Sequence, residues 1–175
     1  MSEERRALVV GLAKSGIPAV KALNQLGYAV DLNDLKPREA FEAILPTLEG
    51  TYRATLFGRH PERISDYDLI LVSPGVPMDL PFINEAKSLG IEVIGELELG
   101  YRMAAGRFYA ITGTNGKTTT TALTGEIFKS AGRHAIVAGN IGQSVVELAE
   151  TSHAETCWIT EVSSFQLESI ARFHP

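Results

Sequence analysis

The chain has 175 residues, of which 45% are hydrophobic, enough for one large domain or one and a half small ones. Its formal net charge of −5 argues against a general nucleic-acid binder, because such proteins usually carry a basic stripe that neutralises backbone phosphates. A single cysteine excludes internal disulfides, and every apolar run is far shorter than the roughly eighteen residues of a membrane span. We expect a soluble, cytoplasmic and monomeric protein with no membrane or nucleic-acid partner.

The chain begins with a strand–helix–strand pattern. An apolar strand over residues 7–10 leads into a glycine turn, a helix that ends near Leu26, and a second strand over residues 28–32. The turn resembles a dinucleotide-binding fingerprint, but Ala13 replaces the middle glycine that lets a pyrophosphate approach the backbone. An NAD-dependent oxidoreductase is therefore disfavoured. Asp34, at the end of the second strand, is placed to accept hydrogen bonds from a ribose or a base edge.

The first domain is predicted to cover residues 1–95. After the opening unit we expect a helix over 37–49, a strand over 52–57, a strand over 68–72, a helix over 80–89 and a strand over 91–94. The strand over 68–72 is almost continuously apolar, as is typical of a parallel strand covered on both faces. Loops at the carboxyl ends of parallel strands line the ligand crevice, so Ser73, Pro74 and Gly75 form a candidate ligand loop. The alternative is a plain Pro-Gly turn.

A helical connector over residues 96–106 precedes a second domain, which is predicted to begin with a strand at Arg107. This strand runs into a loop in which two glycines let the backbone turn tightly, so that several amide N–H groups can converge on one anion. A helix follows, marked by Leu123, Ile127 and Ala131 at a spacing of four. The phosphate-binding loop is predicted to comprise Gly113, Thr114, Asn115, Gly116, Lys117, Thr118 and Thr119.

Two residues of this loop carry distinct chemistry. Lys117 is expected to reach the terminal phosphates of a nucleotide, and the hydroxyl of Thr118 is expected to hold Mg²⁺. The spacing departs from the standard Walker pattern, because Ile111 stands where the first glycine is usual, which leaves a shorter Gly-x-x-Gly-Lys-Thr loop. An ordinary glycine-rich turn with a solvated lysine is the alternative.

The remainder of the chain is predicted to hold a strand over 134–138, a helix over 144–150 and a strand over 157–161. Nucleotide-binding α/β domains commonly have about five strands or more, so we expect residues 107–175 to be the first part of a truncated domain. The predicted fold is α/β, with a Rossmann-like parallel-sheet N-terminal domain followed by an incomplete P-loop domain.

Over essentially all its length the chain resembles the Mur ligases. The loop over 112–119 is shared with sister ligases and with folylpolyglutamate synthetases, so it indicates only the superfamily. The segment over 161–168, Glu-Val-Ser-Ser-Phe-Gln-Leu-Glu, resembles the branch that adds D-glutamate. The other stretches that carry the resemblance are residues 11–16, 33–37, 73–77 and 139–142.

The resemblance implies an ATP-dependent amide-forming ligase of cytoplasmic peptidoglycan assembly, with ATP and Mg²⁺ as cofactors. Its small-molecule substrates would be UDP-N-acetylmuramoyl-L-alanine and D-glutamate, joined through an acyl phosphate. Lys117 and Glu161 would be catalytic, with Thr118 and Glu161 as Mg²⁺ ligands. The substrate-binding residues implied by the resemblance are Lys14, Ser15, Asp34, Leu35, Lys36, Ser73, Pro74, Gly75, Asn140 and Ser163.

Mur ligases continue with a catalytic histidine, a carbamylated lysine and a third domain, so we expect no ligase turnover from this chain alone. The competing hypothesis is a non-catalytic sugar-nucleotide-binding protein that retains the fold. The presence of Lys117, Thr118 and Glu161 favours the enzyme, because a binding module would not need the metal ligands. The four histidines match no catalytic position and are interpreted as surface or packing residues.

Overall fold

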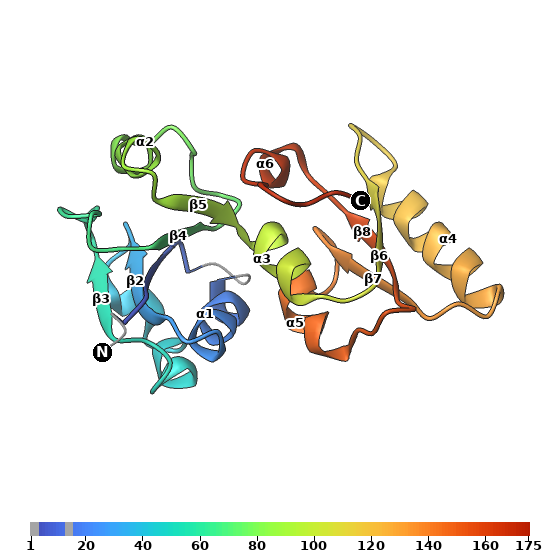
Figure 1. Cartoon of the computed structure of the whole chain (residues 1–175), viewed down its shortest axis with the longest axis horizontal. Helices are drawn as coiled ribbons and strands as arrows, with labels where there is room; N and C mark the ends of the chain where they lie inside the picture. The colour runs from blue at the N-terminus through green and yellow to red at the C-terminus, as the bar shows by residue number, and fades with distance from the viewer. Residues whose placement is uncertain (1–3, 13–15) are drawn as a thin grey trace. The chain divides into compact units, whose positions relative to one another are not determined.

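The computed structural model of the chain describes residues 4–12 and 16–175. The chain divides into two units, residues 1–96 and 97–175. Each holds a sheet whose paired strands are parallel and are flanked by helices, which confirms the predicted α/β fold class (Figure 1). Within the described ranges, no helix is both long enough and apolar enough to cross a bilayer.

The first unit contains a five-stranded parallel sheet in the order β3-β2-β1-β4-β5. The order reverses at β1, which pairs with β2 on one side and with β4 on the other. Such a switch point opens a crevice at the carboxyl ends of the strands. The strands are β1 (Arg6–Val10), β2 (Ala29–Asp34), β3 (Ala54–Phe57), β4 (Leu69–Val72) and β5 (Glu92–Gly95).

Helices flank this sheet (Figure 1). α1 (Gly16–Gln25) buries Ala19, Val20 and Leu23. α2 (Pro81–Ser88) buries Phe82 and Ile83 in a cluster with side chains of β1 and β4. Burial on both faces explains why the central strands read as continuous apolar runs.

The helix predicted over residues 37–49 is wrong. The structure has two short 3₁₀ helices there, η1 (Arg38–Phe41) and η2 (Leu45–Leu48). Pro46 explains the break, because proline has no backbone N–H to donate and is tolerated only in the first turn of a helix, where it stands in η2.

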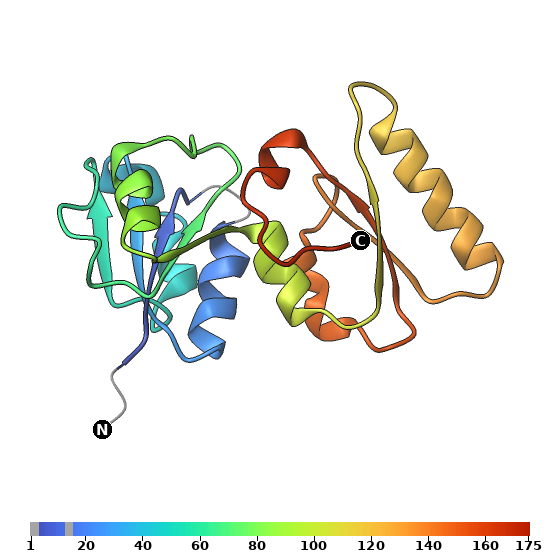
Figure 2. The ribbon, with the colours of Figure 1, turned by 45° about the horizontal axis from the view of Figure 1, so that its top comes forward.

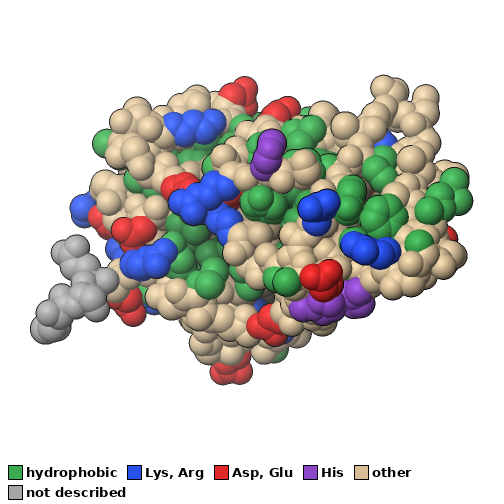
Figure 3. Space-filling model, turned by 45° about the vertical axis from the view of Figure 1, so that its right-hand side comes forward, with side chains coloured by type: hydrophobic (Ala, Val, Ile, Leu, Met, Phe, Trp, Pro, Cys, Tyr) green, Lys and Arg blue, Asp and Glu red, His purple; other side chains and the backbone are tan. Residues whose placement is uncertain are grey.

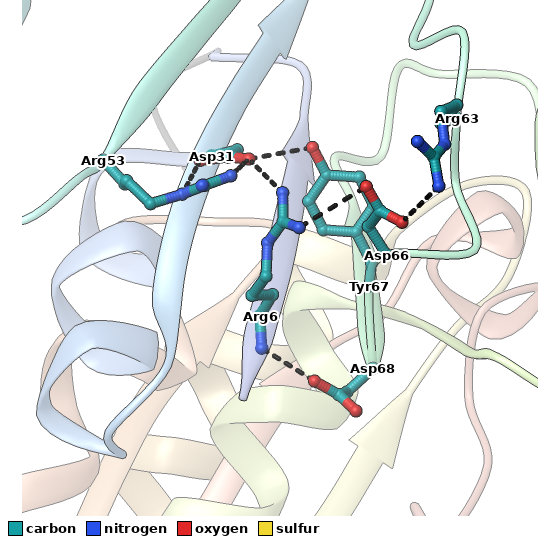
Figure 4. A network of polar contacts seen from close by, with 7 residues as sticks. All are labelled: Arg6, Asp31, Arg53, Arg63, Asp66, Tyr67 and Asp68. Atoms are coloured by element: carbon teal, nitrogen blue, oxygen red, sulfur yellow. Dashed lines mark hydrogen bonds and ion pairs between the residues drawn. The ribbon is translucent and has the colours of Figure 1, made fainter. Parts of the chain in front are cut away.

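A buried carboxylate ties the strands of the first unit together (Figure 4). Asp31, in β2, is 2% exposed and accepts hydrogen bonds from Arg53 Nε at 3.0 Å and Tyr67 Oη at 2.9 Å. Arg6 of β1 lies 3.4 Å from the same carboxylate. Burial and the hydrogen bond to Asp31 raise the pKa of Tyr67 to about 12. This network joins the segment before β4 to β1, to β2 and to the residue before β3.

The second unit has a three-stranded parallel sheet in the order β6-β8-β7, with β8 in the centre. Most of α3 (Glu96–Met103) belongs to this unit, and α4 (Lys117–Ser130) follows the predicted phosphate loop. Its other elements are β6 (Arg107–Ile111), β7 (Ala135–Gly139), α5 (Val145–Leu148), η3 (Ala149–Thr151), β8 (Cys157–Glu161) and α6 (Ser164–Leu167).

Aromatic side chains form the core of this unit. Trp158 of β8 is fully buried and stacks on Phe108 of β6, with ring centroids 5.3 Å apart. Its indole N–H donates to the carbonyl of Ala105 at 2.9 Å. Phe173, near the end of the chain, packs edge-on against Phe108 and Tyr101. Phe173 is therefore part of the core.

α4 lies alongside this sheet and contacts its strands β7 and β8 (Figure 2). Its buried residues are Thr121 and Gly125, and a Cβ on Gly125 would stand 2.3 Å from a methyl group of Val137. Leu123 and Ile127, whose spacing predicted the helix, are 60% and 57% exposed. Figure 3 shows several hydrophobic side chains exposed on one face of the molecule. The predicted helix is confirmed, but its apolar stripe faces away from the sheet.

Two short helices of this unit begin with capping boxes. In α5, Ser144 accepts from the backbone N–H of Glu147, whose carboxylate accepts from the N–H of Ser144. In α6, Ser163 and Gln166 make the same reciprocal pair. Such boxes satisfy backbone donors at a helix start and fix where the helix begins.

Candidate functional site

The predicted phosphate loop connects the end of β6 to the start of α4. Gly116 is the residue that precedes the helix and has a φ of 78°, and Gly113 has a φ of 146°. Other residues rarely adopt these left-handed conformations, so both glycines are required here. Gly116 provides no side-chain cap for the first turn of α4. The N–H groups of that turn have no partner within the helix and, with the helix dipole, favour an anion at this position.

Lys117 folds back over the loop. Its ammonium group donates to the carbonyl of Gly113 at 2.7 Å. A phosphate held by the loop amides would compete with this carbonyl for the ammonium group. The lysine is thus placed beside the position where the loop can receive negative charge.

Three segments far apart in the sequence meet at the carboxylate of Glu161. The Thr118 hydroxyl, in the first turn of α4, donates to Glu161 at 2.8 Å. Asn140, which follows β7, donates its side-chain N–H to the other carboxylate oxygen at 3.0 Å. Glu161 is the last residue of β8 and is 2% exposed. We call Thr118, Asn140 and Glu161 the carboxylate cluster.

The backbone around Glu161 holds this cluster in place. Gly139 of β7 lies opposite Glu161 in the parallel register, and the N–H of Asn140 donates to the Glu161 carbonyl at 2.9 Å. A Cβ on Gly139 would stand 2.3 Å from that carbonyl oxygen. Only glycine permits this approach. The motif over residues 139–142 includes this glycine, but the sequence alone does not indicate why glycine is needed there.

The carboxylate cluster offers oxygen atoms of the kind that hard divalent cations prefer as ligands. Because the Thr118 hydroxyl uses its hydrogen on Glu161, its oxygen lone pairs remain available to a cation. Among the described residues, no group of three or more His, Cys, Asp or Glu side chains could hold a metal. Mg²⁺ is usually bound by one or two carboxylates together with substrate phosphates, so Thr118, Glu161 and a bound phosphate fit this ion.

Ser163 follows the cluster closely in sequence and has a structural task. Its hydroxyl oxygen lies 3.3 Å from the N–H of Gln166 and 3.2 Å from the Gln166 side-chain oxygen. It therefore caps α6, a helix outside the predicted elements. The signal that could have found it is the Ser-x-x-Gln spacing. Next to this cap, Phe165 is 66% exposed.

In the first unit, the candidate substrate residues lie at the carboxyl ends of β1, β2 and β4. Asp34 accepts from the N–H groups of Leu12 at 3.0 Å and Lys36 at 2.9 Å, which ties the end of β2 to the turn after β1. Ser73 is 3% exposed and donates its hydroxyl hydrogen to the carbonyl of Gly11 at 2.7 Å. The structure thus brings Asp34 and Ser73 to the same turn.

The remaining candidates differ in exposure. Leu35 is 59% exposed, Lys36 and Gly75 are also exposed, and Pro74 is half-buried. Lys14 and Ser15 lie outside the described residues.

Two family models match the chain. The family model described as Mur ligase MurD-like, N-terminal domain, matches residues 5–95. The model described as Mur ligase middle domain matches residues 111–174. The chain belongs to the Mur ligase family.

Curated relatives of this Mur ligase chain carry a specific name. The proteins from Alkaliphilus metalliredigens and Alkaliphilus oremlandii, 48% and 50% identical over 176 residues, are both called "UDP-N-acetylmuramoylalanine--D-glutamate ligase". Each alignment covers 99% of this chain and 39% of the relative. The Mur ligase chain therefore spans about two fifths of the length of these relatives.

A solved structure supports the fold of this Mur ligase. The UDP-N-acetylmuramate:L-alanyl-gamma-D-glutamyl-meso-diaminopimelate ligase from Neisseria meningitides aligns with a TM-score of 0.51 at 16% identity. The alignment covers 92% of this chain and 55% of that chain. At this identity the likeness concerns the fold alone.

Proposed function

We propose that this chain is part of a ligase that adds D-glutamate to UDP-N-acetylmuramoyl-L-alanine. Residues 1–95 would bind the uridine nucleotide, and residues 107–175 would form part of the ATP site. Residues 96–106 would be the connector between them. The observation that carries this proposal is the carboxylate cluster at the end of the phosphate loop. The names of the curated relatives support the choice of substrates.

The chemistry of amide formation makes use of this arrangement. A carboxylate is a poor electrophile, so its oxygen first attacks the γ-phosphorus of ATP, and ADP leaves. The amine of D-glutamate then attacks the carbonyl carbon of the acyl phosphate, loses a proton, and inorganic phosphate leaves. Both steps shift negative charge onto phosphate oxygens, and positioned donors lower the barrier by stabilising that charge.

The residues of this chain take particular parts in the first step. The loop amides and Lys117 would hold and neutralise the phosphates once Lys117 leaves the Gly113 carbonyl. Positive charge from Mg²⁺ would offset the negative charge on the phosphates. Thr118 and Glu161 would hold that ion, and Asn140 keeps the Glu161 carboxylate oriented. A non-catalytic sugar-nucleotide reader would need no such metal-binding set.

Nucleotide titration tests the second unit. A fluorescent ATP analogue should bind the chain saturably, and Mg²⁺ should tighten the binding. Glu161→Gln should remove most of the Mg²⁺ effect, because an amide oxygen is a weaker ligand for a hard cation than a carboxylate. Binding that ignores Mg²⁺ in the wild-type chain would contradict the proposed site.

Calorimetry tests the first unit separately. UDP-N-acetylmuramoyl-L-alanine and free UDP should each bind saturably, and NADH should not. Heat from NADH alone would overturn the assignment of residues 1–95. We further propose that the chain alone has no turnover. Phosphate release that requires both the UDP substrate and D-glutamate would contradict this.

A further inference from the structure

The segment that follows Glu161 has little packing of its own. α6 comprises only Ser164–Leu167, and Gln166 is its buried residue. Phe165, Leu167 and Ile170 are 66%, 38% and 37% exposed. Helices this short are not stable by themselves, and in proteins most of the stability of a helix comes from packing rather than from helix propensity. The position of α6 must therefore be set largely at its two ends.

The first end is held by β6. Val162 is fully buried, and its N–H donates to the carbonyl of Ile111 at 2.9 Å. The capping box between Ser163 and Gln166 then fixes the start of the helix. This anchoring fixes one end of the segment beside the carboxylate cluster.

The second end is held by a buried carboxylate from another element. Glu98 of α3 is 0% exposed, and its oxygens accept from the backbone N–H groups of Ala171, Arg172 and Phe173 at 2.9–3.0 Å. The side chain of Arg102 donates to it at 2.7 Å. Glu98 thus meets three consecutive N–H donors that lie 73 to 75 residues further along the chain.

The charge state of Glu98 agrees with this task. Burial raises the pKa of its carboxyl, but the hydrogen bonds from the three N–H groups and Arg102 outweigh burial and hold the pKa below its usual range. The group is therefore ionised at neutral pH. An ionised carboxylate offers only acceptors, which is what four converging donors require.

We propose that Glu98 is a positioning residue of the candidate site, which fixes residues 171–173 and thereby holds the far end of the segment whose near end is fixed beside Glu161. The inference rests on the proposed function of the second unit for its catalytic meaning, since Glu98 touches neither the phosphate loop nor the carboxylate cluster. Glu98 holds the far end of the segment that starts directly after Glu161.

Glu98→Gln tests the proposal in the whole 175-residue chain. Glutamine keeps the shape but turns an N–H₂ group toward backbone donors, so it cannot satisfy them all. Glu147→Gln is the matched control, because Glu147 also accepts a backbone N–H, from Ser144 at 2.7 Å, but caps the separate helix α5. Amide hydrogen exchange is measured in both variants under conditions where the chain is folded.

The expected result is local. In Glu98→Gln, exchange in residues 163–173 becomes at least about tenfold faster, since hydrogen bonds to a charged group are lost, whereas β6 and β8 keep their protection. The proposal is overturned if exchange in 163–173 is unchanged, or if it rises equally throughout the unit, because Glu98 would then contribute only to stability. If Glu98→Gln does not fold, Glu98→Asp, which keeps the charge but shortens the reach, is used for the same comparison.

A binding measurement separates this inference from the proposed function. Mg²⁺ should tighten ATP-analogue binding several-fold less in Glu98→Gln than in the wild type, while binding without Mg²⁺ stays the same. Equal Mg²⁺ effects in the two proteins would contradict a positioning role at the site. If the wild-type chain binds no nucleotide, the proposed function fails and the exchange result alone decides whether Glu98 places α6.

Discussion

The hydroxyl of Thr118 and the carboxylate of Glu161 are 2.8 Å apart although 43 residues separate them in the sequence. This hydrogen bond brings together the two oxygen-bearing side chains that we propose as Mg²⁺ ligands.

Loss of the Thr118 hydroxyl should therefore weaken metal-dependent binding selectively. Thr118→Ala is expected to reduce the Mg²⁺-dependent affinity for an ATP analogue about 10- to 100-fold, the range seen when groups that orient a metal site are removed. Fluorescence titration with and without Mg²⁺ measures this. Thr120→Ala, an exposed position of the same helix, serves as control and should bind like the wild type. A similar loss in both variants would contradict the assignment.

The exposed apolar stripe of α4 predicts a position where substitution has little effect on the free energy of unfolding. Leu123→Gln should change the free energy of unfolding by less than about 0.5 kcal/mol, because the side chain is 60% exposed and surface substitutions have small effects. Phe108→Ala, in the aromatic core, should cost about 3–5 kcal/mol. Urea unfolding of both variants makes the comparison, and a large loss from Leu123→Gln would show that α4 is packed on its other side.

Gly100→Ala should destabilise the second unit despite the better helix propensity of alanine. A Cβ at this position of α3 would stand 2.8 Å from both the backbone nitrogen of Val146 and Cβ of Val145, atoms that cannot move alone. Overpacking of about 1–3 kcal/mol then outweighs the gain of about 1 kcal/mol from replacing glycine. Fluorescence of Trp158, the only tryptophan, follows the unfolding of this unit in urea. A higher urea midpoint would refute the prediction.

The hydrogen bond from Tyr67 to Asp31 predicts a late alkaline titration. The pKa of Tyr67 is raised from 10.0 to about 12. The contribution of this hydrogen bond to stability is therefore complete below pH 10 and is lost as the pH rises toward 12. Absorbance of the phenolate should show one tyrosine ionising near pH 12. Tyr67→Phe should remove that step and Tyr52→Phe should not. A profile that is unchanged in Tyr67→Phe would contradict the assignment.

Much of the strand framework and the phosphate loop could be predicted because their signals are local. Continuous apolar runs indicate buried parallel strands, and the glycines with Lys117 and Thr118 indicate a loop that leads into a helix. The position of Glu161 at the end of a strand is also correct, since β8 is Cys157–Glu161. The roles proposed for these residues remain predictions.

Other features were not predicted, either because the sequence carries no local signal for them or because a different signal was given more weight. Pro46 breaks the predicted helix over 37–49, a signal present in the sequence. The spacing of Leu123 and Ile127 identifies a helix but does not say which face the sheet covers. The contact between Glu98 and residues 171–173 joins distant parts of the chain, and no periodicity or short motif records such a pairing.

Three helices of the second unit differ in how their first turns are capped. Serine side chains cap α5 and α6, whereas α4 begins after Gly116 and has no side-chain cap. A phosphate in that opening would do for α4 what Ser144 and Ser163 do for their helices. Nucleotide would then be a structural component as well as a reactant, and the longest helix of the unit would be complete only while substrate is bound.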